Sequence, residues 1–120
     1  MKSKEFISYL TTAIIDLSMS KMYNNDSKLN TELLTKKLAL LTRFIGNSSD
    51  LELECLYAIQ KLDFKHNHPT GLLRNLFDTF FYCSQIKKES FKFWRKNENP
   101  YFNETNHKFS LNLLIDFFNF

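Results

Sequence analysis

Residues 53–94 read LECLYAIQKLDFKHNHPTGLLRNLFDTFFYCSQIKKESFKFW, and this stretch decides the fold class. Its apolar residues return at steps of three and four, which is the period of one helix face. The first row begins just before the stretch and consists of Leu51, Cys55, Ile59 and Leu62. The next rows are Leu73, Leu76, Phe77 and Phe80, then Phe91 and Trp94. The segments between them, residues 65–69 and Ser84-Gln85, are short and polar. The stretch therefore predicts three short, closely connected helices with aromatic seams.

The same periodicity continues on both sides of this stretch. Upstream, it predicts a helix over residues 4–21 with the core row Phe6, Leu10, Ala13 and Leu17. It also predicts a second helix, which Thr31 caps and Gly46 ends. The core row of this helix is Leu34, Leu38, Leu41 and Ile45. Downstream, after a polar gap over residues 97–105, a last helix carries Phe109, Leu113 and Phe117, with Leu114 and Phe118 alongside.

One helix start has a more specific signal. Ser49 and Glu52 have the spacing of a capping box, in which the Ser49 hydroxyl accepts from the amide of Glu52. The carboxylate of Glu52 is then expected to accept from the amide of Ser49 in return.

The composition fits long helices joined by short loops. The chain has 120 residues, enough for one domain at most, and it contains only two glycines and two prolines. Turn-rich β folds need more of both residues. Short loops make sequential helices antiparallel neighbours, and stacked helical hairpins build HEAT-like solenoids. We therefore predict an all-α fold, a HEAT-like α-α superhelix of about six helices in one domain over residues 1–120.

The candidate catalytic and metal sites are weak. Asp63, His66 and His68 offer oxygen and nitrogen donors, but no second pair of ligands stands at a regular spacing, so no metal is predicted. Cys83 with His68 or His107 could imitate a thiol and its base, but no local signature accompanies them. Cys55 and Cys83 are instead expected to be small buried residues in a reducing compartment.

Other features argue against an enzyme, a membrane protein or a secreted one. No glycine-rich phosphate-binding motif or paired-carboxylate motif occurs, so we predict no catalysis, no cofactor and no small-molecule substrate. Polar residues interrupt the apolar stretch after Lys2 and Lys4, which argues against a signal peptide. No apolar run approaches the roughly 18 residues of a membrane span. The sequence therefore predicts a cytoplasmic protein.

The predicted helix over residues 87–96 is strongly basic. On a helix its cations lie largely on one side, away from Phe91 and Trp94. Three interpretations stay open: a solvated face, a contact surface for phosphate or an acidic peptide, and a face that holds single-stranded RNA. Phe77, Phe80, Phe91 and Trp94 are expected in the core. The predicted partner-binding residues are Tyr82, Lys88, Lys92, Phe93, Arg95 and Lys96.

The stretch also resembles a known family. Residues 56–60 (LYAIQ), Pro69 with residues 71–74 (GLLR), Phe77-Asp78, and Glu89, Phe91 and Trp94 are similar to the C-terminal HEAT-type domain of translation initiation factor 4 gamma and of its shortened paralogue. Related domains end initiation factor 5 and the epsilon subunit of factor 2B. The resemblance covers most of the chain but only the later part of such a domain. It implies a non-catalytic protein-docking scaffold, associated in the 4 gamma branch with recruitment of MAP-kinase-interacting kinases.

The chain departs from this family where docking is expected. Family members carry acidic residues among aromatics near the C-terminus, and these face basic partner segments. Here the turn after Phe77-Asp78 is Tyr82-Cys83-Ser84, and the next helix is basic. Like charges repel, so a basic segment would dock poorly at this place.

Three hypotheses follow from the sequence. The first is a protein-binding module of a translation initiation scaffold, which docks a kinase or another initiation factor. The second is an RNA-binding module that uses the helix over residues 87–96. The third is a fragment whose first helix needs further helices of a larger domain to cover it.

Overall fold

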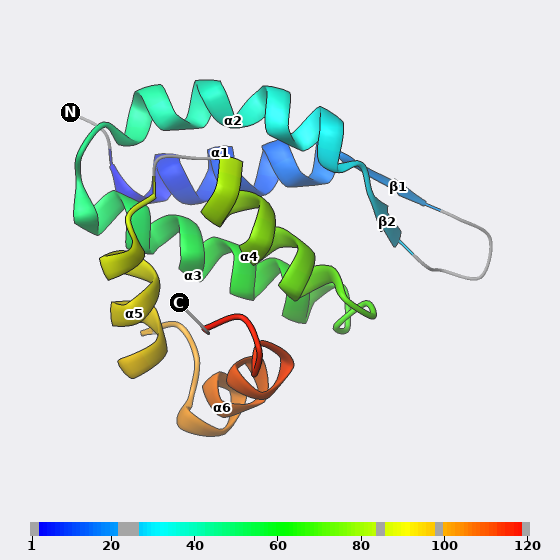
Figure 1. Ribbon diagram of the computed structural model, residues 1–120, viewed down its shortest axis with the longest axis vertical. Coiled ribbons are helices and arrows are strands. Elements are labelled where there is room, and N and C mark those ends of the chain that lie inside the picture. The colour runs from blue at the N-terminus through cyan, green and yellow to red at the C-terminus, as the bar shows by residue number, and fades with distance from the viewer. Residues whose placement is uncertain (1–2, 22–26, 84–85, 98–99, 119–120) are drawn as a thin grey trace.

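The computed structural model describes residues 3–21, 27–83, 86–97 and 100–118. These residues form six helices and one short antiparallel ribbon (Figure 1). In chain order the elements are α1 Lys4–Leu17, β1 Met19–Lys21, β2 Ser27–Leu29, α2 Thr31–Ile45, α3 Ser49–Lys65, α4 Leu72–Cys83, α5 Lys88–Lys96 and α6 Glu104–Leu113. The all-α, HEAT-like fold class is thus confirmed, with the ribbon as an addition that the periodicity did not predict.

Helix α3 is the centre of the fold. It packs against α1, α4 and α5, and α1 and α4 also contact α2. In Figure 1, α1, α2 and α3 run side by side while α4 lies obliquely across them, with α5 and α6 at the lower end. All but a few α3 residues between Glu52 and Asp63 are buried, because the helix has neighbours on several sides. The residues predicted for the aromatic core, Phe77, Phe80, Phe91 and Trp94, are all fully buried.

The predicted core face of α1 is wrong by one position. Phe6 and Leu17 are exposed, and the buried residues are Ile7, Thr11, Ile14 and Ile15. Both sets have helical spacing, so periodicity alone did not separate them. The β-branched row packs on α3, where the Thr11 hydroxyl donates to the thiol of Cys55 at 3.3 Å.

Helix α1 also ends four residues before its predicted end. The Ser18 hydroxyl donates to the carbonyl of Ile14 at 2.9 Å, a local bond that competes with continued helix. Met19 then pairs with Leu29 across the ribbon, and the Asn30 amide donates to the carbonyl of Ser18 at 2.7 Å. Pairing with a segment ten residues away thus replaces the last predicted turn.

The other helices follow the sequence more closely, although the predicted cap Thr31 is wrong. The N-cap of α2 is Asn30, whose side chain accepts from the Leu33 amide at 3.0 Å. Gly46 ends α2 with φ +60°, a value that glycine adopts freely. The last helix begins earlier than its apolar row and ends at Leu113, followed by turns through residue 118. Its predicted row is wrong in part, since Phe109 and Leu113 are exposed while Leu114 and Phe117 are buried. The predicted break at Ser84-Gln85 lies outside the described residues.

Candidate interaction surface on helix α5

Aromatic packing fixes which side of α5 faces the core. Phe91 and Trp94 are fully buried and meet the ring of Phe77 edge-on, with centroid distances of 5.7 and 4.8 Å. Because these residues lie on one side of a nine-residue helix, its other side faces solvent. The predicted basic face is confirmed as an exposed face, and it carries Lys88, Lys92, Arg95 and Lys96.

A buried glutamine joins α5 to α3 and α6. The Trp94 indole N–H donates to Gln60 Oε1 at 3.1 Å. The Gln60 amide donates to Ser110 Oγ at 3.0 Å and lies 3.3 Å from His107 Nδ1. Both ends of a fully buried amide therefore have partners, which avoids the cost of burying unpaired polar atoms. This network fixes the position of Trp94 and with it the rotation of α5.

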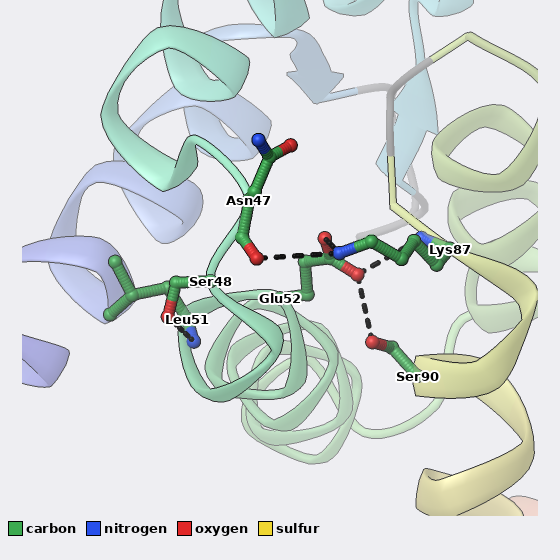
Figure 2. Close-up of polar contacts among 6 residues, drawn as sticks. All are labelled: Asn47, Ser48, Leu51, Glu52, Lys87 and Ser90. Carbon is green, nitrogen blue, oxygen red and sulfur yellow. Dashed lines mark hydrogen bonds and ion pairs between the residues drawn. The ribbon is translucent and has the colours of Figure 1, made fainter.

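A buried carboxylate fixes the start of α5 (Figure 2). Glu52 accepts from the Lys87 backbone N–H at 3.0 Å and from Ser90 Oγ at 2.8 Å, and it pairs with the Lys87 ammonium at 3.0 Å. Lys87 is the N-cap residue of α5 and its own side chain does not cap the helix. The negative charge of the Glu52 carboxylate is also favourable at the N-terminus of α5, which is the positive end of the helix dipole. Glu52 therefore holds the first turn of α5 from a different helix.

This arrangement contradicts the predicted capping box. The N-cap of α3 is Ser48, whose hydroxyl accepts from the amide of Leu51 at 3.3 Å, and Ser49 is the first helical residue. Figure 2 shows the Glu52 side chain pointing across to Lys87 and Ser90, with which it makes its hydrogen bonds. Lys87 and Ser90 together offer three hydrogen-bond donors to the Glu52 side chain, which is only 2% exposed. The local cap would offer it a single donor, the backbone amide of Ser49.

Three of the basic residues line a pocket with an aromatic wall. Lys92, Arg95, Lys96 and Phe118 surround about 230 Å³, and we call this site the basic pocket. The Arg95 guanidinium lies 5.0 Å from the centre of the Phe118 ring, a cation–π contact. Phe118 in turn stacks on Trp94 at 6.1 Å and 14°. The aromatic wall of the pocket, Phe118, therefore rests on Trp94, the residue that anchors α5 in the core.

The other predicted partner-binding residues lie apart from the basic pocket. Phe93 is half exposed and lines a second pocket on the other flank of α5, formed with Ser49, Asp50, Leu53, Glu89 and Ser90. Tyr82 is 77% exposed near the end of α4, where its ring packs edge-on against Phe81. Lys88 is exposed on the first turn of α5 and lines neither pocket. The six residues thus form several surfaces, and their contact with a partner stays a prediction.

Two residues that shape the candidate site were not predicted from the sequence. Phe118 was assigned only to a seam of the last helix, but the turns after α6 place its ring beside Arg95. Glu52 was assigned to a local cap, but it orients the helix that carries the basic residues. The basic helix itself was visible as a charge cluster, whereas no sequence spacing links position 118 to position 95.

The weak chemical candidates do not form a site in the described residues. Asp63 hydrogen-bonds to His68, while His66 lies 3.6 Å from a different carboxylate, that of Asp16. Within those ranges of the chain, no three side chains of His, Cys, Asp or Glu come together as a metal site would require. Burial is the main cause of a raised pKa at Asp63, and the hydrogen bond from His68 opposes it.

The two cysteines differ in their surroundings. Cys55 is buried as predicted, and burial raises the pKa of its thiol to about 12. The prediction for Cys83 is wrong, because it lies exposed at the last residue of α4. At a helix end the chain leaves the core, so the apolar periodicity of α4 no longer implies burial.

The comparison with known proteins gives a distant relationship. No protein-family model matches the chain. Over 100 residues, 83% of its length, the chain is 25% identical to eukaryotic translation initiation factor 4 gamma 3 of Homo sapiens. The mouse protein of the same name matches at the same identity and coverage. The chain spans only 6% of the length of each of these relatives. In sequence, the chain is thus similar to one short region of initiation factor 4 gamma.

Proposed function

We propose that this chain is a non-catalytic protein-binding module of a translation initiation scaffold. The observation that carries the proposal is the similarity to initiation factor 4 gamma 3 across 83% of the chain, which spans the α5 surface. An all-helical body with exposed charged and aromatic side chains on α5 is suited to binding another protein. The proposed location is the cytoplasm. Among the described residues, no helix has the length and apolar character that crossing a membrane requires.

The proposed partners are a MAP-kinase-interacting kinase or another initiation factor. The proposed binding residues are Tyr82, Lys88, Lys92, Phe93, Arg95 and Lys96. We also propose that residues 1–120 correspond to the later part of a larger HEAT-type domain. The exposed aromatic residues of α1, Phe6 and Tyr9, fit this idea, because a further helix could cover them.

A direct binding measurement tests the proposal. The purified chain is immobilised, and purified kinase and individual initiation factors are passed over it at physiological salt. We expect saturable binding of at least one of them, weakened by the double substitution Lys88→Glu with Lys92→Glu. A matched double variant, Lys36→Glu with Lys65→Glu, changes the net charge equally on α2 and at the end of α3 and should bind normally. Absence of binding to every factor and to the kinase would contradict the proposed function.

RNA binding is the second candidate, because four exposed cations share one face of α5. Phosphate contacts of this kind give an affinity that falls steeply with salt. The aromatic side chains favour it less: Phe118 already contacts Arg95 and Trp94, and Phe93 lies on the other flank. A filter-binding assay with single-stranded RNA decides. Binding that is unchanged in the Lys88→Glu and Lys92→Glu double variant would dismiss this candidate.

A further inference from the structure

The basic pocket brings together three cations that no carboxylate of the described residues pairs. Elsewhere on the described surface, four basic residues lie beside a carboxylate: Lys36 with Glu32, Arg74 with Asp78, Lys87 with Glu52 and Lys108 with Glu104. Within the described part of the chain, Lys92, Arg95 and Lys96 have no such carboxylate. Three uncompensated cations around one pocket create a local positive potential that attracts an anion.

The pocket is also partly preorganised. Arg95 lies over the Phe118 ring, and that ring stacks on Trp94, which the buried Gln60 holds. An arginine already held against an aromatic ring loses less side-chain entropy when it binds a ligand. A planar guanidinium also matches the geometry of a carboxylate, with two parallel hydrogen bonds. The pocket is therefore better suited to a carboxylate than a loose lysine cluster would be.

The size of the pocket restricts its occupant. Its volume of about 230 Å³ is below the roughly 300–1,000 Å³ of sites that enclose small molecules. It is large enough for single side chains that a larger partner inserts. Lys92 and Lys96 are four residues apart on α5, so their Cβ atoms lie about 5–6 Å apart. Alternate residues of an extended chain repeat at roughly 6.5 Å, which lets two alternate carboxylates meet both lysines.

From these observations we propose that the basic pocket binds an acidic segment of a partner protein, with alternate Asp or Glu side chains paired to Lys92, Arg95 and Lys96. The proposal rests on the proposed protein-binding function and names the chemistry of the partner. RNA is the less favoured ligand, because base stacking needs open aromatic faces and the Phe118 ring is already engaged by Arg95 and Trp94.

Fluorescence anisotropy with a short labelled peptide tests this proposal. The probe carries glutamate at alternate positions, and its twin carries glutamine at the same positions. We expect saturable binding of the glutamate peptide only, weakened by added salt. The Lys92→Glu and Lys96→Glu double variant should weaken it by about tenfold or more, since attraction is replaced by repulsion at two sites. The control double variant of Lys36 and Lys65 should bind like the original chain.

A second variant examines the preorganised arginine. Arg95→Lys keeps the charge but loses the planar guanidinium over the Phe118 ring, so the affinity should fall several-fold with the charge unchanged. Equal binding of the glutamate and glutamine peptides would overturn the proposal. Full binding by the Lys92 and Lys96 double variant would also overturn it. Tighter, equally variant-sensitive binding of single-stranded RNA of matched charge would overturn it in favour of a nucleic-acid site.

The two proposals fail separately. If an initiation factor or the kinase binds but the glutamate peptide does not, the acidic-segment proposal is refuted and the scaffold function stands. If the peptide binds through the basic pocket while no initiation factor or kinase does, the pocket is supported and the scaffold function is refuted. Circular dichroism of each variant establishes that a lost affinity does not come from unfolding.

Discussion

Replacing Glu52 by glutamine should loosen α5 from α3 and destabilise the whole domain. The substitution keeps the size of the side chain and removes its charge. Two hydrogen bonds, from the Lys87 amide and from Ser90 Oγ, change from charge-assisted to neutral. With its oxygen kept at the Oε1 position, the glutamine places its NH2 group at the Oε2 position, where the Lys87 ammonium already donates. The effect should therefore exceed that of a surface substitution.

The magnitude follows from these contacts. A hydrogen bond to a charged group contributes about 1.5–3 kcal/mol, and a neutral one about 1 kcal/mol, so each of the two bonds loses about 1 kcal/mol. The ion pair adds up to about 1 kcal/mol, a small value because the Lys87 side chain is 44% exposed. We therefore expect Glu52→Gln to lower the free energy of unfolding by about 3 kcal/mol. For a domain of this size, that is a large part of the total stability.

Urea unfolding measured by tryptophan fluorescence is the assay. Trp94 is the only tryptophan and lies on α5, so its emission reports the element that Glu52 holds. The matched control is Glu32→Gln, since that carboxylate is 85% exposed and pairs with Lys36 at 3.9 Å. It should cost less than about 0.5 kcal/mol. A loss below about 1 kcal/mol for Glu52→Gln would refute the reasoning.

Four further predictions concern a buried glutamine, the two cysteines and one turn. Gln60→Leu leaves the Trp94 indole N–H and Ser110 without their amide partner, and should cost about 2–3 kcal/mol in urea unfolding, with faster amide exchange in α5 and α6. In the native chain, Ellman's reagent should react with exposed Cys83 at pH 8 and reach Cys55 only after unfolding, because burial raises the pKa of the Cys55 thiol to about 12. The same raised pKa means that the stability from Cys55 is fully present below pH 9 and is lost as the pH rises towards 12, which alkaline unfolding would show. Gly46→Ala should lower the free energy of unfolding by about 1–3 kcal/mol in thermal unfolding, because φ is +60° and an added Cβ meets no atom within 4 Å, so only backbone strain acts.

The orientation of α5 links stability to the candidate site. Gln60 holds its middle through Trp94, and Glu52 holds its start through Lys87 and Ser90. These contacts turn the buried face of α5 towards α3 and leave its cations on the outside. We expect substitutions at Glu52 to weaken binding of the glutamate peptide at the basic pocket only to the extent that they detach α5 from α3. The affinity for the peptide and the Trp94 emission should therefore change together.

Much of the fold could be predicted from local sequence. Apolar spacing found each helix, Gly46 marked the end of α2, and the large aromatic residues of α4 and α5 identified the core. Spacing could not choose between neighbouring rows of α1, because Phe6 and Ile7 begin two rows with the same helical period. It also could not find the ribbon, whose strands are only three residues long and stabilise each other by pairing.

The candidate site on α5 could also be predicted from the sequence only in part. The sequence alone determined that α5 is amphipathic, with a basic face opposite Phe91 and Trp94, because the helical period fixes which residues share a side. Only the tertiary structure decided that Phe93 faces a pocket shared with Ser49 and Leu53 of α3, that Phe118 lies beside Arg95, and that Glu52 serves α5 instead of its own helix. The physical reason is that these contacts join residues far apart in the chain. A local period carries no information about them, and they depend on which partners the packed helices bring within hydrogen-bonding or stacking distance.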